Sequence, residues 1–167
     1  ADVVAVIRDP RAQARLRAAG AARVVVADAA DAPQAAAAAS DRGVDVFIDT
    51  TRHVDLGSVP EQLNSRGRIL AIAGQGRIGL ELWSFYVREV QLLGFVMSAM
   101  TPGELAAAAD WINAAHSSRP LSVGVGRVLG FEAAAEAHAT LESGQLPRMA
   151  DGTVGRLVLQ PNPPPSE

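Results

Sequence analysis

The chain has 167 residues, of which 49% are hydrophobic and 20% charged, and its formal net charge at pH 7 is −3. This composition is typical of a globular domain with a sizeable core. The absence of Cys excludes disulfides, thiolate zinc sites and cysteine nucleophiles, and with only three His we expect no zinc site. The basic residues form no stripe and no apolar run approaches about 18 residues, so we expect a cytoplasmic protein without nucleic-acid or membrane partners.

The first part of the chain alternates between short apolar runs and helical patterns. The apolar, β-branched runs predict buried strands at residues 3–7, 24–26, 44–48, 69–72 and 92–97. The segments between them predict helices at about 10–20, 32–42, 56–65 and 82–90. Strands that alternate with helices in this way predict a doubly wound α/β fold with a parallel sheet.

The pattern changes after Met97. Thr101, Pro102 and Glu104 fit the N-cap, N1 and N3 positions of a capping box that opens a helix running to about His116. A strand at 123–129, an amphipathic helix at 131–142 and a last strand at 154–159 follow. We therefore expect an α/β part at 1–98, a C-terminal α+β segment at 99–160 and a disordered tail at 161–167.

A glycine-rich motif, Gly74-Gln75-Gly76-Arg77-Ile78-Gly79, follows the fourth predicted strand. A dinucleotide-binding G-x-G-x-x-G leads directly into a helix, and an acidic residue ends the next strand about 20 residues later. Here the next strand ends near Ser98 without an acid. We interpret the motif as a loop at the carboxyl end of a strand, where open α/β sheets still contact ligands.

Arg8 and Asp9 end the first predicted strand. In dinucleotide-binding folds an acid here favours NAD, since it accepts a hydrogen bond from the ribose 2′-hydroxyl, whereas Arg favours the 2′-phosphate of NADP. Arg8 comes first, but Asp9 keeps NAD open, and both also fit a solvated turn that caps the next helix. His53 fits either a ligand contact or a helix start, and His138 fits a surface position on a helix.

Several segments keep the order and spacing of one known family. They are Arg11–Ala21 with Val24-Val25-Val26, Gly43-Val44-Asp45-Val46-Phe47-Ile48-Asp49, Gly67-Arg68-Ile69-Leu70, Phe131–His138 with Leu141-Glu142-Ser143-Gly144, and Gly155-Arg156-Leu157-Val158-Leu159. Together they resemble the C-terminal half of medium-chain dehydrogenases/reductases, and most closely the zinc-free NADPH quinone oxidoreductases. The resemblance implies a Rossmann-type fold at 1–98 and, at 99–160, a segment that packs on the family's catalytic domain.

The resemblance also implies a cofactor site, without naming a catalytic residue. Its residues are Arg8 with Asp9 at the adenosine ribose; Thr50, Thr51 and Arg52 in the loop after the third strand; Ile72, Ala73 and Gly74 at the nicotinamide carboxamide; Phe95, Val96 and Met97 near the nicotinamide; and Arg156 in the closing motif. We expect NADPH to be preferred over NADH, because Arg8 precedes Asp9.

The family's first strand, Gly-rich loop and catalytic domain have no counterpart in the sequence. In the strand order 3-2-1-4-5-6 the first strand is central, and each main-chain group that it leaves unpaired costs roughly 1–3 kcal/mol. The sequence begins at Ala1 rather than Met. We therefore expect a missing N-terminal part of the same protein, or another chain, to supply this strand.

The resemblance implies an NADPH-dependent oxidoreductase that passes hydride to a quinone or an α,β-unsaturated carbonyl without metal. We expect the parent protein to be the enzyme and this chain alone to be inactive. The alternative is a non-catalytic module that binds the cofactor or dimerises. For either function we expect a homodimer through the edge of the strand at 92–97, which is apolar and carries no charge.

Overall fold

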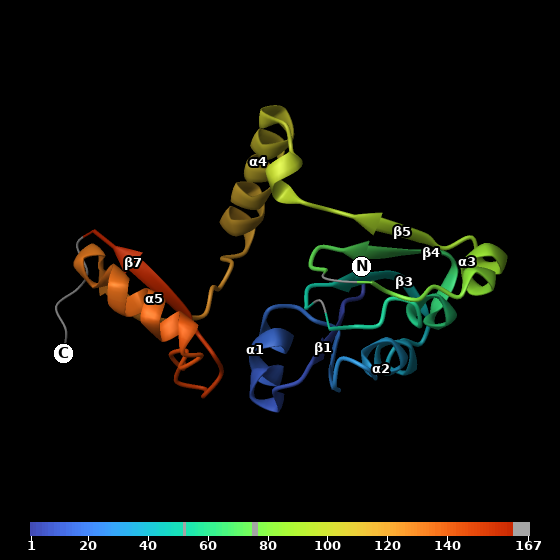
Figure 1. Ribbon diagram of the computed structural model, residues 1–167, viewed down its shortest axis with the longest axis horizontal. Helices are drawn as coiled ribbons and strands as arrows, with labels where there is room; N and C mark the ends of the chain where they lie inside the picture. Colours follow the sequence, from blue (N-terminus) through green and yellow to red (C-terminus); the bar gives the residue numbers. More distant parts are fainter. Residues whose placement is uncertain (52, 75–76, 162–167) are drawn as a thin grey trace. The chain divides into compact units, whose positions relative to one another are not determined.

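The structure, a computed structural model, describes residues 1–51, 53–74 and 77–161. The chain divides into two compact units, residues 1–114 and 115–167, which are described separately below (Figure 1). In both units the strand pairs are parallel. The predicted α/β class is therefore confirmed.

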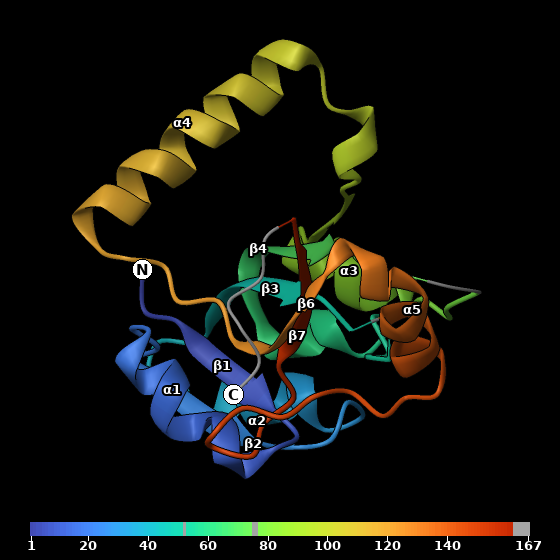
Figure 2. The same cartoon turned by 90° about the vertical axis from the view of Figure 1, so that its left-hand side faces the viewer.

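The first unit opens with a two-stranded parallel sheet. Strands β1 (Val4–Ile7) and β2 (Arg23–Val26) pair from Val4↔Arg23 to Ile7↔Val26. Turn η1 (Pro10–Ala12) and helix α1 (Gln13–Ala18) connect them, and α1 lies beside the pair (Figure 2). Helix α2 (Ala32–Ala38) follows β2. The turn after β1 places Arg8 and Asp9 directly at the carboxyl end of that strand.

A three-stranded parallel sheet of order β3-β4-β5 forms the rest of this unit. Its strands are β3 (Val44–Asp49), β4 (Leu63–Ala71) and β5 (Gln91–Gly94). Turn η2 (Val59–Gln62) and helix α3 (Leu82–Arg88) pack against it. The buried core consists of Leu56, Val59, Leu63 and Ile69, with Phe47 and Phe85 packed against it.

The helix predicted at 56–65 is wrong. The structure has only the short turn η2 there, and Leu63 is already extended at the start of β4. The physical reason is Pro60, which occupies the first turn of η2 and would break a longer helix from within, because it lacks an amide proton and clashes with the preceding turn. Arg66, at φ 64°, then bends β4 before its regular pairing resumes at Arg68.

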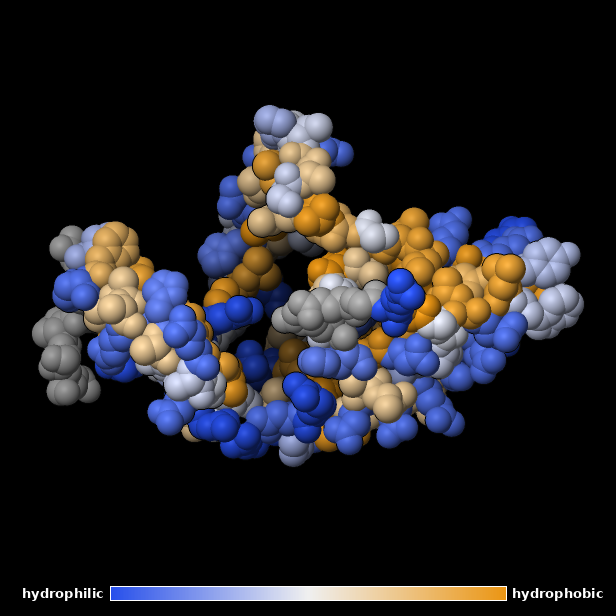
Figure 3. All heavy atoms as spheres, viewed as in Figure 1, coloured by the Kyte–Doolittle hydropathy of each residue, from blue (hydrophilic) through white to orange (hydrophobic). Residues whose placement is uncertain are grey.

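Within the described residues the two sheets of the first unit are not joined. Strand β1 bonds only to β2, and β3 only to β4, so one edge of each lacks a partner strand. This is the break expected from a missing central strand. One face of the larger sheet also stays open: Ile48 and Leu93, which share a register level with Leu70, are 55% and 44% exposed. Hydrophobic residues gather over the region of β5 and α3 (Figure 3).

Helix α4 (Pro102–Ser118) begins with the predicted capping box. The Thr101 amide and hydroxyl both donate to Glu104 Oε2 at 2.8 Å, and the Glu104 amide donates to Thr101 Oγ1 at 3.3 Å. Within the described part of the chain, neither α4 nor any other helix has the length and apolar character needed to cross a membrane.

The second unit contains a two-stranded parallel pair. Strands β6 (Val125–Gly130) and β7 (Arg156–Gln160) pair from Val125↔Arg156 to Gly130↔Gln160. Turn η4 (Phe131–Ala133) and helix α5 (Ala134–Glu142) lie between them in sequence. Only glycine fits at position 155, because any side chain there would clash with the main chain of Gly126. Residues 162–167 of the predicted tail lie outside the described residues.

Candidate functional site

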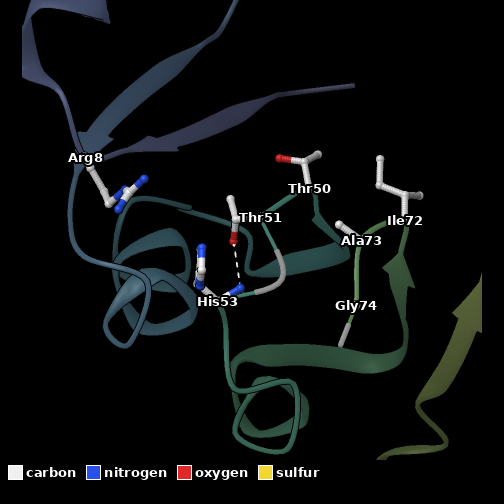
Figure 4. A pocket seen from close by; sticks show the side chains of 7 residues that line it. All are labelled: Arg8, Thr50, Thr51, His53, Ile72, Ala73 and Gly74. Carbon is white, nitrogen blue, oxygen red and sulfur yellow. Dashed lines mark hydrogen bonds between the residues drawn. The ribbon is translucent and has the colours of Figure 1, made fainter. Parts of the chain in front are cut away.

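An open hollow of about 550 Å³ lies where three strands of the first unit end (Figure 4). Its lining comes from the segments that follow β1, β3 and β4: Arg8, Thr50, Thr51, His53, Ile72, Ala73 and Gly74. Ligands of open parallel α/β folds bind at this position, outside the carboxyl ends of the strands. The volume is in the range of small-molecule sites, about 300–1,000 Å³.

The loop after β3 is held by a buried acid. Asp49 is only 2% exposed, and its Oδ1 accepts hydrogen bonds from the Thr51 amide at 2.8 Å and the Thr51 hydroxyl at 2.9 Å. The Thr51 hydroxyl in turn accepts from the His53 amide at 3.2 Å. The loop is therefore fixed by its own main chain and side chains, and Thr51 uses its hydroxyl proton within the protein.

Thr50 differs from Thr51 in the state of its hydroxyl. Thr50 is exposed on the hollow, and its hydroxyl makes no hydrogen bond with any residue that the structure describes. Such a hydroxyl can both donate to and accept from a ligand. Of the two threonines predicted for the site, Thr50 therefore offers the better contact and Thr51 the structural support.

Arg8 supplies positive charge at the hollow. Its side chain extends from the end of β1 toward the loop of Thr51 and His53 (Figure 4). It is exposed and forms neither an ion pair nor a hydrogen bond through its side chain with the described residues. A guanidinium in this state can pair with an incoming phosphate without first breaking a protein contact.

Asp9 is not part of the lining. It is the N-cap of η1, where its Oδ1 accepts from the Arg11 amide at 3.1 Å. The Arg11 guanidinium also binds both carboxylate oxygens, from Nε at 2.8 Å and from Nη2 at 2.7 Å. Arg8 and Asp9 therefore have different surroundings in the structure. Arg8 faces the hollow, whereas the Asp9 carboxylate is bound by Arg11.

The end of β4 forms the opposite wall of the hollow in Figure 4. The Ile72 amide donates to the Asp49 carbonyl at 3.2 Å, which ties this wall to the end of β3. Gly74 has open space where a side chain would stand. Gln75 and Gly76 of the glycine-rich motif lie outside the described residues, and the next helix, α3, begins only at Leu82.

Other predicted site residues do not line the hollow. Phe95, Val96 and Met97 follow β5 and are exposed, although the Phe95 amide donates to the Ala71 carbonyl at 3.1 Å, next to the wall that β4 provides. Arg156 begins β7 in the second unit. Arg52 lies outside the described residues. The roles predicted for these residues stay predictions.

His53 lines the hollow, and its sequence context fits either a ligand contact or a helix start. No described helix begins at His53, since the next turn is η2 at Val59. Its position in the loop that Asp49 anchors is the only signal that could have assigned it to the site. It adds a ring with two nitrogens to the side of the hollow that Arg8 approaches.

A sequence profile described as zinc-binding dehydrogenase matches residues 16–147, which is most of the chain. The chain belongs to this family. It is a medium-chain dehydrogenase/reductase, as the order of its motifs predicts. No curated protein sequence matches the chain.

Solved structures share the fold of this chain. The quinone oxidoreductase of Thermus thermophilus, described with its NADPH complex, is 24% identical with a TM-score of 0.69 over 95% of this chain and 49% of its own. A Pseudomonas syringae quinone oxidoreductase is 17% identical, with a TM-score of 0.70 over 95% and 48%. An NAD-dependent alcohol dehydrogenase is 25% identical, with a TM-score of 0.67 over 95% and 43%. The chain spans less than half the length of each.

The residues of this chain do not fit the zinc that the family description names. The sequence has no Cys and three His. Among the described residues, no group of three or more His, Cys, Asp or Glu could hold a metal ion.

Proposed function

We propose that the protein containing this chain is an NADPH-dependent oxidoreductase that transfers hydride to a quinone or an α,β-unsaturated carbonyl, without zinc. The observation that carries this proposal is Arg8, an unpaired cation among the described residues, at a hollow formed by the ends of parallel strands. The NADPH complex of the Thermus thermophilus quinone oxidoreductase supports it. Nicotinamide would supply the hydride, and the protein would bind and orient it.

Each wall of the hollow would hold a different part of the dinucleotide. Arg8 would pair with the 2′-phosphate, and the Thr50 hydroxyl would bond to the ribose or phosphate beside it. The main chain at Ile72, Ala73 and Gly74 would hold the carboxamide, because no side chain of Gly74 blocks a close approach. Phe95, Val96 and Met97 would cover the nicotinamide ring.

This chain would supply positioning rather than acid–base chemistry. The described lining contains one His and no acid. A hydride acceptor would be placed by the fixed walls and shielded from water by apolar groups such as Ile72. The zinc-free part of the proposal rests on the donor set of this chain, which offers no thiolate ligand.

The open strand edges lead to two proposals about partners. A strand from the N-terminal part of the same protein would fill the position between β1 and β3, where neither edge has a described partner. A second copy would pair along the free edge of β5, whose residues Gln91–Gly94 are all exposed and uncharged. We place the assembled protein in the cytoplasm.

A second candidate function is a module without turnover that binds the cofactor or dimerises. The exposed apolar edge of β5 favours it. Calorimetric titration with NADPH and NADH, followed by NADPH oxidation assays with quinones, separates the two when it is done on the protein that contains this chain. Quinone-dependent oxidation by that protein supports the enzyme, cofactor binding without oxidation supports the module, and absence of NADPH binding contradicts both proposals for the hollow.

A further inference from the structure

The contact between Asp9 and Arg11 determines which charge a ligand meets at the end of β1. The Arg11 guanidinium approaches the carboxylate side-on, with Nε on Oδ1 and Nη2 on Oδ2. Both distances are those of strong charge-assisted hydrogen bonds, about 2.7–2.9 Å. The Arg11 amide adds a third bond to Oδ1 at 3.1 Å. Asp9 therefore has both oxygens engaged within three consecutive residues.

This engagement matters because a free carboxylate at this position would oppose a 2′-phosphate. An acid that selects NAD accepts hydrogen bonds from the ribose hydroxyls and repels the extra phosphate. Three of the roughly four lone-pair sites of the Asp9 carboxylate are already used by Arg11. The positive charge of Arg11 also offsets the negative charge of Asp9, in an ion pair whose two side chains are 51% and 35% exposed.

We propose that Arg11 is a specificity-determining positioning residue: by holding the Asp9 carboxylate, it leaves Arg8 as the charge that meets the ribose and makes the site select NADPH. The inference rests on the proposed function, since it assumes that the hollow binds the dinucleotide. Arg11 acts through Asp9 and is not a ligand in this arrangement. Arg8 lines the hollow, whereas Arg11 does not.

The proposal predicts an effect of Asp9 that appears only when Arg11 is absent. Arg11→Ala would remove the two guanidinium hydrogen bonds and the compensating positive charge but keep the main-chain amide bond, and the carboxylate would then repel the 2′-phosphate. We expect the ratio of NADPH to NADH affinity to fall about tenfold, because the negative charge of Asp9 near the 2′-phosphate is no longer compensated by Arg11. Asp9→Asn in the Arg11→Ala background should restore the ratio, and Asp9→Asn alone should not lower it.

The experiment is calorimetric titration of the full chain and its variants with NADPH and with NADH. Asn replaces Asp well as an N-cap, so the turn at η1 is kept in the double variant, and circular dichroism checks the fold. Arg17→Ala is the matched control. It removes an exposed Arg from the following helix, where Arg17 Nη2 donates to Gln13 Oε1 at 3.2 Å, and the affinity ratio should stay unchanged.

The outcomes separate this inference from the proposed function. Loss of NADPH preference in Arg11→Ala, rescued by Asp9→Asn, supports the role of Arg11. An unchanged ratio in Arg11→Ala overturns it, and so does a loss that Asp9→Asn fails to rescue, because Arg11 would then contact the phosphate itself. If the unsubstituted chain binds neither nucleotide, the proposed function fails and this inference fails with it.

Discussion

Asp49 accepts two hydrogen bonds from one residue, Thr51, through its amide at 2.8 Å and its hydroxyl at 2.9 Å. The carboxylate is buried at the end of β3, so the bonds hold the following loop against the strand end. One consequence is that the neighbouring threonines have different tasks. Thr51 secures the loop, while Thr50 keeps its hydroxyl for a ligand.

The two threonines can be tested against each other. Thr50→Val, which keeps the shape and removes the hydroxyl, should weaken NADPH binding about five- to tenfold while leaving the free energy of unfolding nearly unchanged. Thr51→Val should instead lower the free energy of unfolding by about 1–2 kcal/mol, since a bond to the buried Asp49 carboxylate is lost. Denaturant unfolding and NADPH titration measure the two effects. A stability loss in Thr50→Val would contradict the assignment.

Arg8 is expected to distinguish the two nicotinamide cofactors. Arg8→Ala should weaken NADPH binding about tenfold or more and NADH binding much less, because only NADPH carries the 2′-phosphate. Calorimetry with both cofactors measures this difference. Arg42→Ala is a suitable control, since Arg42 is exposed and pairs with Asp2 at 2.7 Å, away from the hollow lining. Equal losses for both cofactors in Arg8→Ala would remove the reason for choosing NADPH.

The capping box should make the start of α4 sensitive to acid. Hydrogen bonds from the Thr101 amide and hydroxyl lower the pKa of Glu104 below its usual value. A depressed pKa in the folded state stabilises the cap above the unfolded-state pKa, and this stabilisation is lost as pH falls through the folded-state pKa. NMR shifts of the Thr101 and Glu104 amides should follow this titration. In Glu104→Gln, where a capping amide replaces the acid, the same shifts should show no such step.

The proposed pairing through β5 predicts an effect of charge on assembly. Leu93→Lys places a charge on the apolar, 44% exposed face of the edge strand, and edge lysines oppose strand pairing between chains. Sedimentation velocity should show a shift from dimer to monomer. Leu121→Lys, at an exposed apolar residue in the second unit, should leave the sedimentation coefficient unchanged. A monomeric unsubstituted chain would contradict the pairing.

Features decided within a few residues of the chain could be predicted from the sequence. The β-branched runs at β1, β2 and β3 identified strands, because such residues fit a pleated surface, although Val26, Val46 and Ile48 are exposed within the described residues rather than buried as predicted. The capping box at Thr101 and Glu104 was also predictable, because its hydrogen bonds join residues only three positions apart in the sequence. The helix predicted at 56–65 does not form, because Pro60 in the first turn of η2 is incompatible with a longer helix through this segment.

The sequence by itself determined the family, the order of strands and the residue types that end them. Only the tertiary structure decided which of those residues meet. Arg8, Thr50 and Ile72 are far apart in sequence and line one hollow, because parallel strands end at a common edge. It also decided that Asp9 binds Arg11 while Arg8 faces the hollow, since this depends on side-chain directions that neither residue type nor spacing specifies.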